Sequence, residues 1–415
     1  MRIQVPYGQH DVLTVQLDEG RVAGVVHPNE VPVGDQKKTL EAALNQPINS
    51  KSFDKFLEDA RDVLFIVNDA TRPTPTAKVL EMLAPRLEGQ QVNFIVATGI
   101  HRAPVPEEYQ RIFGKFYEIY RDRIVAHDAK RDQDMVYIGK SKNGTEMYVN
   151  RMGVDAHKIV IIGSVEPHYF AGYTGGRKAF LPGIASYKTV EQNHKFALRM
   201  EAQALALEGN PVHEDMIDAL KTIEGKEIFA IMTVLNSEHR IYASTAGHIH
   251  DSFQAAIEKA NDVFAVKIGS KADVVVTVAP FPMDVDLYQA QKALDNGKLA
   301  LKDGGVLILV AKCRTGVGHE TFARLLNSSK TPQDALNQID REYKLGYHKA
   351  AKMAEIGLWA QMYGVTDLED SLLEGCFLKP YHDLQEAVDQ ALKEKGPGAK
   401  VLFLMAGSLT VPIVS

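Results

Sequence analysis

The chain has 415 residues, with 47 lysines and arginines against 53 aspartates and glutamates, so its formal net charge at pH 7 is −6. Hydrophobic residues make up 45% of the chain, which is enough for packed cores and excludes a largely disordered protein. At about 100–200 residues per domain, this length predicts two or three domains. The mildly acidic charge, without a block of lysines and arginines, argues against a nucleic-acid-binding surface.

The two cysteines, Cys313 and Cys376, lie far apart in the sequence. They exclude a disulfide scaffold and a cysteine-based zinc cluster, and they fit a reducing compartment. The first twenty residues contain no basic segment followed by an apolar stretch, so we expect no signal peptide. The longest apolar runs fall short of the ~20 residues that span a bilayer. We therefore expect a cytoplasmic protein that binds neither membrane nor nucleic acid.

Residues 1–265 are predicted to form an N-terminal domain in which short apolar runs alternate with helical segments. The first thirty residues alternate in polarity and contain turn signals, which indicates antiparallel strands. The later runs are apolar without alternation, which is typical of parallel strands buried on both faces. A helix is expected over residues 74–87, with Thr74 as its N-cap and Pro75 at its first position. The predicted buried strands are Val63–Val67, Val92–Ala97, Met135–Ile138, Lys158–Gly163 and Ile228–Leu235.

A second α/β domain is predicted over residues 272–400, joined to the first by a helix over residues 252–263. Its start follows a right-handed βαβ pattern. For the final tail, residues 402–415, packing back on the N-terminal domain is left open. The predicted fold is therefore two α/β domains with mostly parallel sheets around an interdomain cleft and hinge, where small ligands usually bind. The elements of the βαβ pattern are a strand at Ala272–Val278, a helix over 287–301, a turn at 302–305 and a strand at Val306–Val310.

Polar loops follow three of the predicted strands, at Asn68–Pro73, Thr98–Arg102 and Ser164–Lys178. The carboxyl ends of parallel strands meet at one edge of a sheet, so these loops are expected to converge. Taken singly, each has a structural interpretation: a strand-end histidine can cap a loop, Arg72 can pair with Asp69, and glycines can form a tight turn. Their joint occurrence favours a functional site.

Common cofactor fingerprints do not fit these loops. A Walker loop would need glycine at position 177 and serine or threonine at 179, where Arg177 and Ala179 stand. No G-x-G-x-x-G follows a strand, and no G-x-S-x-G occurs. In the second domain, Gln289 and Lys292 share one face near a helix N-terminus, which suits a carboxylate or phosphate, although a solvated helix face remains the alternative.

Taken together, the segments resemble the lactate racemase family, whose members are nickel-pincer-nucleotide enzymes. They run from Asp69 to Trp359 in the family's order. His168 precedes Lys178 by ten residues, and Lys178 precedes His194 by sixteen, which fits the family pattern. The matching segments are Asp69–Pro75, Thr98–Arg102, Glu166–His168, Gly175–Lys178, Leu181–Ala185, Asn193–His194 and Leu287–Lys292.

The resemblance implies a racemase or epimerase that inverts C2 of a small 2-hydroxy acid by hydride transfer. The implied cofactor is nickel(II) pyridinium-3,5-bisthiocarboxylate mononucleotide, the nickel-pincer nucleotide, which accessory biosynthetic enzymes supply. Lys178 would hold it covalently through a thioamide and, with the nickel ligand His194, form the metal site. His101 and His168 would be the acid/base pair. The implied cofactor contacts are Asp69, Ala70, Thr71, Arg72, Lys178, Gln289 and Lys292, and the implied substrate contacts are Arg72, Tyr288, Gln289, Lys292 and Trp359.

The chemistry explains why two histidines are expected. The C2 hydrogen beside an ionised carboxylate is too weakly acidic for a histidine with a pKa of about 6.5 to remove as a proton. Removing it as hydride, while one histidine takes the hydroxyl proton, gives a planar 2-oxo acid. Hydride then returns to the other face and the second histidine reprotonates the oxygen. A guanidinium clamp from Arg72 would fix the carboxylate meanwhile.

Two other interpretations remain open. One is a cofactor-independent sugar-acid isomerase or lyase, in which Lys178 binds an anion or forms a Schiff base. The other is a small-acid-binding protein without catalysis. The sequence does not select among lactate, malate, aromatic and sugar acids as ligands, and it does not predict the oligomeric state.

Overall fold

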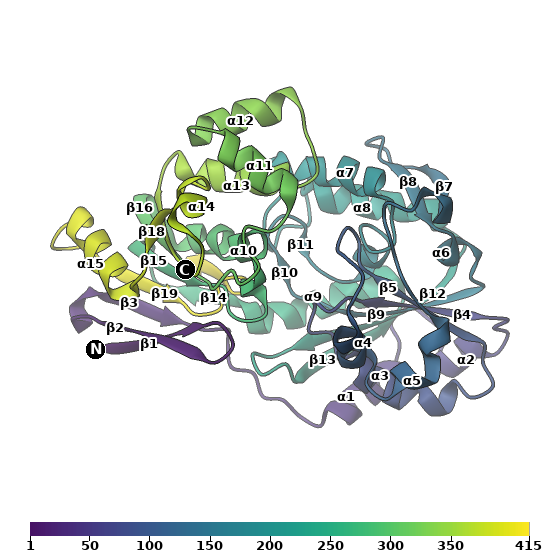
Figure 1. The fold of residues 1–415 in the computed structure, drawn as a ribbon. Coiled ribbons are helices and arrows are strands. Elements are labelled where there is room, and N and C mark those ends of the chain that lie inside the picture. The colour runs from purple at the N-terminus through teal and green to yellow at the C-terminus, as the bar shows by residue number, and fades with distance from the viewer. Residues whose placement is uncertain (415) are drawn as a thin grey trace. The chain divides into compact units, whose positions relative to one another are not determined.

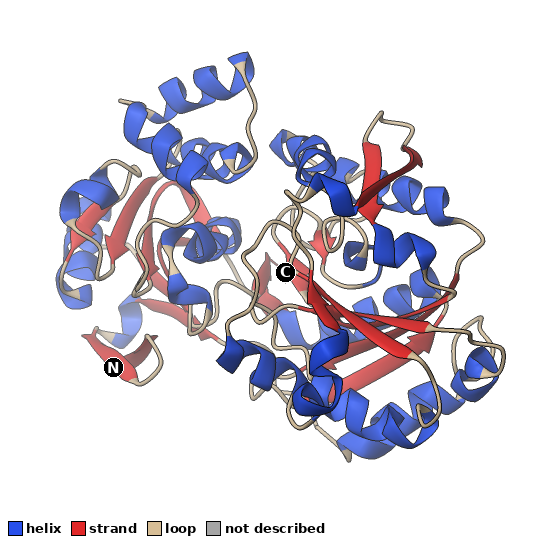
Figure 2. Ribbon diagram, turned by 45° about the vertical axis from the view of Figure 1, so that its right-hand side comes forward, coloured by secondary structure: helices blue, strands red, loops and turns tan. Residues whose placement is uncertain are grey.

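The computed structural model describes residues 1–414 and divides the chain into two compact units (Figure 1). Unit 2 is Glu30–Val263, whereas unit 1 combines Met1–Asn29 with the chain from Phe264 onward. In each unit, helices flank a mostly parallel sheet (Figure 2). The predicted fold class, two α/β domains with mostly parallel sheets, is confirmed.

The division differs from the predicted one at both ends of the chain. The first 29 residues belong to unit 1, because β3 (Val22–Val26) extends its sheet by pairing with β19 (Val401–Leu404). The C-terminal tail also belongs to unit 1 rather than to the N-terminal domain, because β20 (Val411–Val414) pairs in parallel with β14 (Ala265–Ile268). These pairings join segments far apart in sequence, which the local pattern does not encode.

Unit 2 is built on a six-stranded sheet in the order β13-β12-β9-β4-β5-β6, with only β13 antiparallel to its neighbour. The first five residues of β4 and the whole of β9 are buried, as expected for strands covered on both faces. Phenylalanines fill the core beside them. The strands are β4 (Val63–Asn68), β5 (Val92–Ala97), β6 (Ile124–Ala126), β9 (Lys158–Ser164), β12 (Glu227–Leu235) and β13 (Ile241–Gly247).

Helices and two small hairpins surround this sheet. The helix predicted from Thr74 begins two residues later, because the Thr74 hydroxyl bonds to Ser164 Oγ at 2.9 Å instead of capping the helix. The strand predicted at Met135 forms a separate hairpin, not part of the main sheet. The elements are α1 (Gln36–Asn45), α2 (Phe53–Leu57), α3 (Thr76–Leu83), α4 (Pro106–Phe113), α5 (Phe116–Tyr120), α6 (Arg151–Asp155), α7 (Tyr187–Lys195), α8 (Pro211–Leu220), α9 (Ile249–Phe264), β7 (Met135–Lys140) with β8 (Glu146–Asn150), and β10 (Pro167–His168) with β11 (Gly172–Tyr173).

Unit 1 has a six-stranded parallel sheet in the order β18-β17-β16-β15-β19-β3. The predicted turn at 302–305 lies inside β16: Ala272 pairs with Leu301 and Val274 with Val306, so the residues between bulge from the ladder. The elements not yet given are β15 (Ala272–Val278), β16 (Leu301–Val310), β17 (Gln361–Val365), β18 (Lys379–Tyr381), the hairpin β1 (Arg2–Tyr7) and β2 (Asp11–Gln16), α10 (Leu287–Gly297), α11 (Glu320–Ser328), α12 (Pro332–Arg341), α13 (Tyr347–Gly357), α14 (Asp370–Glu374) and α15 (Leu384–Lys395).

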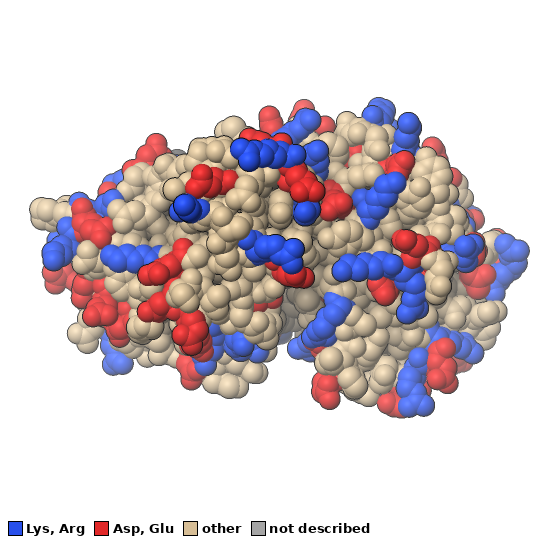
Figure 3. Space-filling view, turned by 45° about the horizontal axis from the view of Figure 1, so that its top comes forward, with Lys and Arg blue, Asp and Glu red and all other residues tan. Residues whose placement is uncertain are grey.

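The surface carries both signs of charge. On the face drawn in Figure 3, lysine and arginine side chains alternate with aspartate and glutamate side chains, and no broad area has a single sign. Among residues 1–414, none of the helices is long and apolar enough to cross a membrane.

Candidate active site

Three loops of unit 2 begin side by side at the carboxyl edge of its sheet. β4 lies between β5 and β9, with Asn68 opposite Ala97 and Val67 opposite Ile162. The loops after these strands begin with Asp69, Thr98 and Val165, within one residue of the predicted starts at Asn68, Thr98 and Ser164. The parallel register thus gathers the polar residues that follow each strand.

Asp69 and His101 form a close pair at this edge. Asp69 Oδ2 lies 2.7 Å from His101 Nδ1, while Oδ1 accepts hydrogen bonds from the amide and hydroxyl of Thr71. Burial alone would raise the pKa of Asp69, but His101, Thr71 and Arg72 outweigh it and hold the pKa below its ordinary value. An ionised carboxylate only accepts, so His101 carries its proton on Nδ1 and presents the Nε2 lone pair as a base.

His168 has the opposite arrangement. It lies in β10, is buried, and its Nδ1 accepts a hydrogen bond from the backbone amide of Ala171 at 3.3 Å. A backbone N–H only donates, so Nδ1 of His168 is unprotonated and the neutral ring carries its proton on Nε2. The two predicted acid/base residues therefore differ: His101 presents an acceptor and His168 a donor.

Arg72 is held by Glu166. Its Nη1 donates to Glu166 Oε1 at 2.6 Å, and the carboxylate side chain is only 5% exposed. The hydroxyl of Thr174 in turn accepts the Glu166 amide at 3.0 Å. The structural alternative for Arg72, pairing with Asp69, is therefore replaced by a pair across two loops. A guanidinium has five N–H donors, so this contact leaves others for a carboxylate ligand. The sequence predicts no role for Glu166, although this residue follows the neighbouring strand and opens one of the segments that resemble the family.

Lys178 follows a glycine-rich loop whose backbone conformation requires glycine at position 175. Gly175 has φ +87°, and a Cβ there would lie 2.7 Å from a Val165 methyl. The Lys178 side chain is half-buried. Burial, helped by the nearby Arg177 and Arg72 guanidinium groups, lowers the pKa of Lys178 well below its ordinary value. A neutral amine is the nucleophilic form of lysine.

Arg177 is the reason for part of that shift. It is 1% exposed, its guanidinium lies 4.3 Å from the Phe253 ring centre, and it donates to the Ala171 carbonyl at 2.7 Å. Burial lowers the pKa of Arg177 to about 9. The loop thus places a buried positive charge next to Lys178 in the chain.

Phe170 brings three of the predicted residues together. Its ring centre lies 4.5 Å from that of His168, 5.0 Å from that of His194 in α7, and 5.6 Å from the Lys178 amine. Phe170 is 2% exposed, so it is a fixed wall. Sequence reasoning missed Phe170, because a buried phenylalanine beside a histidine carries no chemical signature.

The residues predicted in the second domain belong to unit 1. Asp286 caps α10 by accepting the Gln289 amide at 2.7 Å, and Lys292 donates to Gln289 Oε1 at 2.8 Å, so these two side chains share a helix face as expected. The centre of the Tyr288 ring lies 3.6 Å from the Lys349 ammonium, which donates to the Tyr288 carbonyl. A helix N-terminus with a lysine suits an anionic ligand.

Trp359 does not lie with these residues. It precedes β17, and its carbonyl accepts the amide of Gly304 near the start of β16, which places it at the amino edge of the sheet. Tyr288 follows the carboxyl end of the parallel strand β15, at the opposite edge. Trp359 instead borders a cavity of about 460 Å³ with Lys298 and Asp303. We therefore do not include Trp359 in the candidate site, because it lies at the opposite edge of the sheet from Tyr288.

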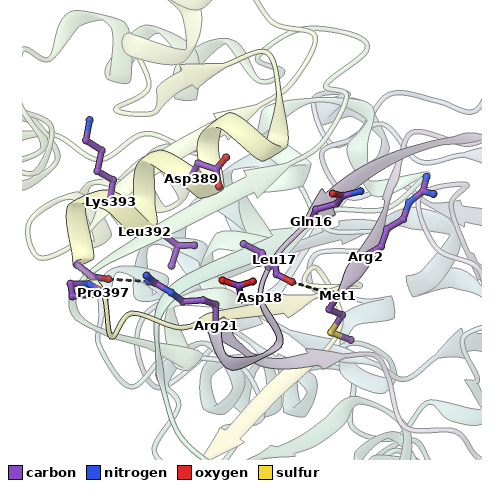
Figure 4. Close-up of a pocket in the computed structure, with 11 residues that line it drawn as sticks. Met1, Arg2, Gln16, Leu17, Asp18, Arg21, Asp389, Leu392, Lys393 and Pro397 are labelled. Carbon is purple, nitrogen blue, oxygen red and sulfur yellow. Dashed lines mark hydrogen bonds between the residues drawn. The ribbon is translucent and has the colours of Figure 1, made fainter.

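A larger cavity in unit 1 lies apart from all predicted site residues. It measures about 880 Å³ and is formed by the β1–β2 hairpin, the segment after it and α15 (Figure 4). Charges of both signs line it, including Arg2, Arg21, Asp389 and Lys393. Arg21 is already engaged by the carbonyls of Gly396 and Ala399.

His194 is the remaining candidate metal ligand. It is 7% exposed and its Nδ1 lies 3.2 Å from Asn193 Oδ1, so Nε2 is the nitrogen that a metal would meet. Over residues 1–414, histidine, cysteine, aspartate and glutamate side chains form no group of three or more that could hold a metal ion.

A histidine–aspartate pair, a second, buried histidine and a half-buried lysine follow strands of one mostly parallel sheet, which indicates the class: an α/β enzyme. The models for the lactate racemase N-terminal and C-terminal domains match residues 7–206 and 267–411. The chain therefore belongs to the lactate racemase family, and the predicted resemblance is confirmed. Racemases are isomerases, so the predicted enzyme class is confirmed as well.

Two curated relatives and one solved structure support this membership. The chain is 32% identical over 402 residues to the lactate racemase of Thermoanaerobacterium thermosaccharolyticum, with 93% of each chain covered. It is 29% identical to the lactate racemase of Lactiplantibacillus plantarum, with 98% of each covered. The structure of the lactate racemase apoprotein from Thermoanaerobacterium thermosaccharolyticum matches with a TM-score of 0.92 and 30% identity over both whole chains.

Proposed function

We propose that this protein is a racemase or epimerase of small 2-hydroxy acids that uses a nickel-pincer nucleotide attached to Lys178. The observation that carries the proposal is the convergence of His168, Lys178 and His194 on Phe170. Lactate is the first substrate to test, because both curated relatives are named for it. We further propose a cytoplasmic location and dependence on accessory cofactor-biosynthesis enzymes.

The donor set fits this cofactor. Lys178 offers a half-buried amine on a rigid glycine loop, and His194 offers a buried imidazole that contacts the same Phe170 ring. Neutral imidazole is a suitable ligand for Ni(II). When bound, the cofactor supplies an acceptor for the hydride that leaves C2.

His101 is the base that the structure supports best. Its Nε2 takes the hydroxyl proton of the substrate, and the Asp69 carboxylate stabilises the imidazolium that forms. His168 donates a hydrogen bond from its Nε2–H to a substrate oxygen. To pass a proton to that oxygen, the ring must also be protonated on Nδ1, because a neutral ring that lost its only N–H proton would become an imidazolate. To act as a base from its own side, His168 must break its hydrogen bond with the Ala171 amide, so the two directions of the reaction start from different arrangements.

The charged groups around these histidines bind and orient the substrate. Glu166 fixes the Arg72 guanidinium, whose remaining N–H groups clamp the substrate carboxylate. Asp69, Ala70 and Thr71 form the loop wall against the cofactor. For unit 1 we propose that Tyr288, Gln289 and Lys292 bind an anionic group at the α10 N-terminus.

The test is racemisation by protein co-expressed with cofactor-biosynthesis enzymes. Each enantiomer of lactate, then malate, aromatic and sugar acids, is supplied pure, and loss of optical activity is followed. We expect racemisation of at least one acid by the native chain and none by Lys178→Ala. Turnover that persists in Lys178→Ala without nickel would favour the cofactor-independent isomerase or lyase. Ligand binding without any turnover would favour the small-acid-binding protein.

A further inference from the structure

We propose that Asn193 and Asp215 position His194 for metal binding, by holding its ring in the tautomer with the proton on Nδ1 and the lone pair on Nε2. The link to a metal rests on the proposed function, whereas the tautomer follows from hydrogen bonds within unit 2. These bonds run from a buried carboxylate outward to the histidine.

Asp215 is a fully buried acceptor in α8. Its Oδ1 accepts from Ser141 Oγ at 2.5 Å, and its Oδ2 accepts from Thr145 Oγ1 at 2.7 Å and from Asn193 Nδ2 at 2.8 Å. Ser141 Oγ itself accepts the Thr145 amide at 3.1 Å, so its own hydrogen is directed to Asp215. Three groups therefore converge on one carboxylate that has no exposed surface.

These partners fix the orientation of the Asn193 amide. The nitrogen and oxygen of an asparagine side chain are ordinarily assigned from their neighbours. Asn193 Nδ2 faces Asp215 Oδ2 and the Val212 carbonyl at 3.3 Å, and both of these only accept. The NH₂ group must therefore point to them, and Oδ1 must point to the other side, where His194 Nδ1 lies at 3.2 Å.

The orientation of Asn193 in turn decides the protonation of His194. An amide oxygen only accepts, so His194 Nδ1 carries the proton and the neutral ring has its lone pair on Nε2. Histidines that bind metals usually donate their other N–H to a carboxylate or carbonyl, which fixes the ring and its tautomer. Here an asparagine amide stands between the histidine and the carboxylate. The set joins the β7–β8 hairpin, α8 and α7, so the fold itself holds the ring.

The test is the tautomer of His194 in the full-length chain without cofactor, measured by long-range ¹H–¹⁵N NMR on protein with labelled histidine at a pH where the ring is neutral. A His194→Gln variant assigns the signal. We expect a protonated Nδ1 in the native chain. Asn193→Leu removes the acceptor and is expected to shift the ring toward the Nε2-protonated form. Ser141→Ala is the matched control, because it removes another hydrogen bond to Asp215 and leaves Asn193 in place.

A second readout is nickel retained per Lys178-modified chain after co-expression with the biosynthetic enzymes. We expect Asn193→Leu to bind the metal about 10–100-fold more weakly, and Ser141→Ala to bind it as the native chain does. If Asn193→Leu does not fold, Asn193→Ala, which also removes the acceptor, replaces it with the same expectation for the tautomer and the same contradicting outcome. A native His194 protonated on Nε2, or an unchanged tautomer in a folded Asn193→Leu, overturns the proposal. If the native chain never acquires nickel, the proposed function is contradicted. The NMR measurement still tests the tautomer, because it uses the chain without cofactor.

Discussion

The carboxyl edges of the two sheets carry polar residues of different construction. In unit 2, charged groups are paired with buried partners from neighbouring loops, as in His101 with Asp69 at 2.7 Å and Arg72 with Glu166 at 2.6 Å. In unit 1, Lys292 bonds to Gln289 on its own helix, one turn away. Partners on different strands fix a side chain in space, whereas a partner on the same helix moves with it.

The difference indicates a division of labour. Chemistry that depends on protonation needs groups held within a few tenths of an ångström, and unit 2 supplies them. Long side chains at a helix N-terminus suit the binding of an anion, and unit 1 supplies those. Substitutions in unit 2 should therefore lower kcat, whereas those in unit 1 should mainly raise KM.

The largest effect is expected for the base. His101→Asn keeps a polar side chain but cannot take a proton, so kcat for racemisation should fall by about 10²–10⁴-fold. Racemisation is measured by polarimetry on cofactor-loaded protein. The exposed His239→Asn is the control and should keep native activity. A kcat for His101→Asn within about threefold of native would show that His101 is not the base.

Asp69→Asn should have the next largest effect, lowering kcat by about 10²-fold, because the amide can present its NH₂ to His101 and stabilise the wrong tautomer, as known for other histidine–aspartate pairs. The measurement is again polarimetry on cofactor-loaded protein. A native kcat in this variant would show that the hydrogen bond between Asp69 and His101 does not contribute to catalysis.

The same variant tests stability against pH. The pKa of Asp69 is lowered in the folded chain, so its contribution to the free energy of unfolding is present above its unfolded pKa of about 3.9 and is lost as pH falls through the folded pKa. We expect the native chain and the Asp69→Asn variant to differ most at neutral pH and to approach each other in acid, as measured by urea unfolding. An unchanging difference would contradict the lowered pKa.

His213 tests the electrostatics behind the unit 2 site. Burial, with Arg177 and His250 nearby, lowers its pKa to about 3, whereas an unfolded histidine has a pKa of about 6.5. Well between these values the unfolded chain binds one more proton than the folded chain, so the free energy of unfolding should fall by about 1.4 kcal/mol per pH unit as pH drops from about 5.5 to about 4. His213→Gln should reduce the slope by about that amount in urea titrations at pH values of about 5.5 and 4.5. Equal slopes would show that His213 is not the source.

The smallest effect is expected in unit 1. Lys292→Met keeps the length of the side chain and removes its charge, so KM should rise by about tenfold while kcat changes little. The exposed Lys330→Met is a matched control in the same unit. A loss of kcat as large as that of His101→Asn would contradict the assignment of catalysis to the sheet edge of unit 2 and of binding to that of unit 1.

Much of the fold followed from local pattern. The strands Val92–Ala97 and Ala272–Val278 were predicted with their observed ends, because continuous apolar runs between turn signals mark buried strands. The division into units was not predicted correctly, because β3 and β20 pair with strands that lie far away in the sequence. The bulge in β16 looked like a turn because glycine and aspartate favour both.

In the candidate site, too, the features that depend on local pattern were predicted and those that depend on long-range contacts were not. Strand-end loops placed Asp69 and His101 correctly, because parallel strands bring such loops together. The Glu166 partner of Arg72 and the Phe170 wall required knowledge of which side chains meet. Trp359 was assigned to the site by resemblance alone; the strand β17 that follows it, and that places it at the amino edge of the sheet, was not predicted.

The most direct measurement is intact mass together with nickel content, on protein co-expressed with the cofactor-biosynthesis enzymes. We predict a mass increase carried by the peptide that contains Lys178, with about one nickel per chain, and neither in Lys178→Ala. An unmodified native chain without nickel, under conditions that load another member of the family, would contradict the proposed cofactor and leave His194 without a metal to bind.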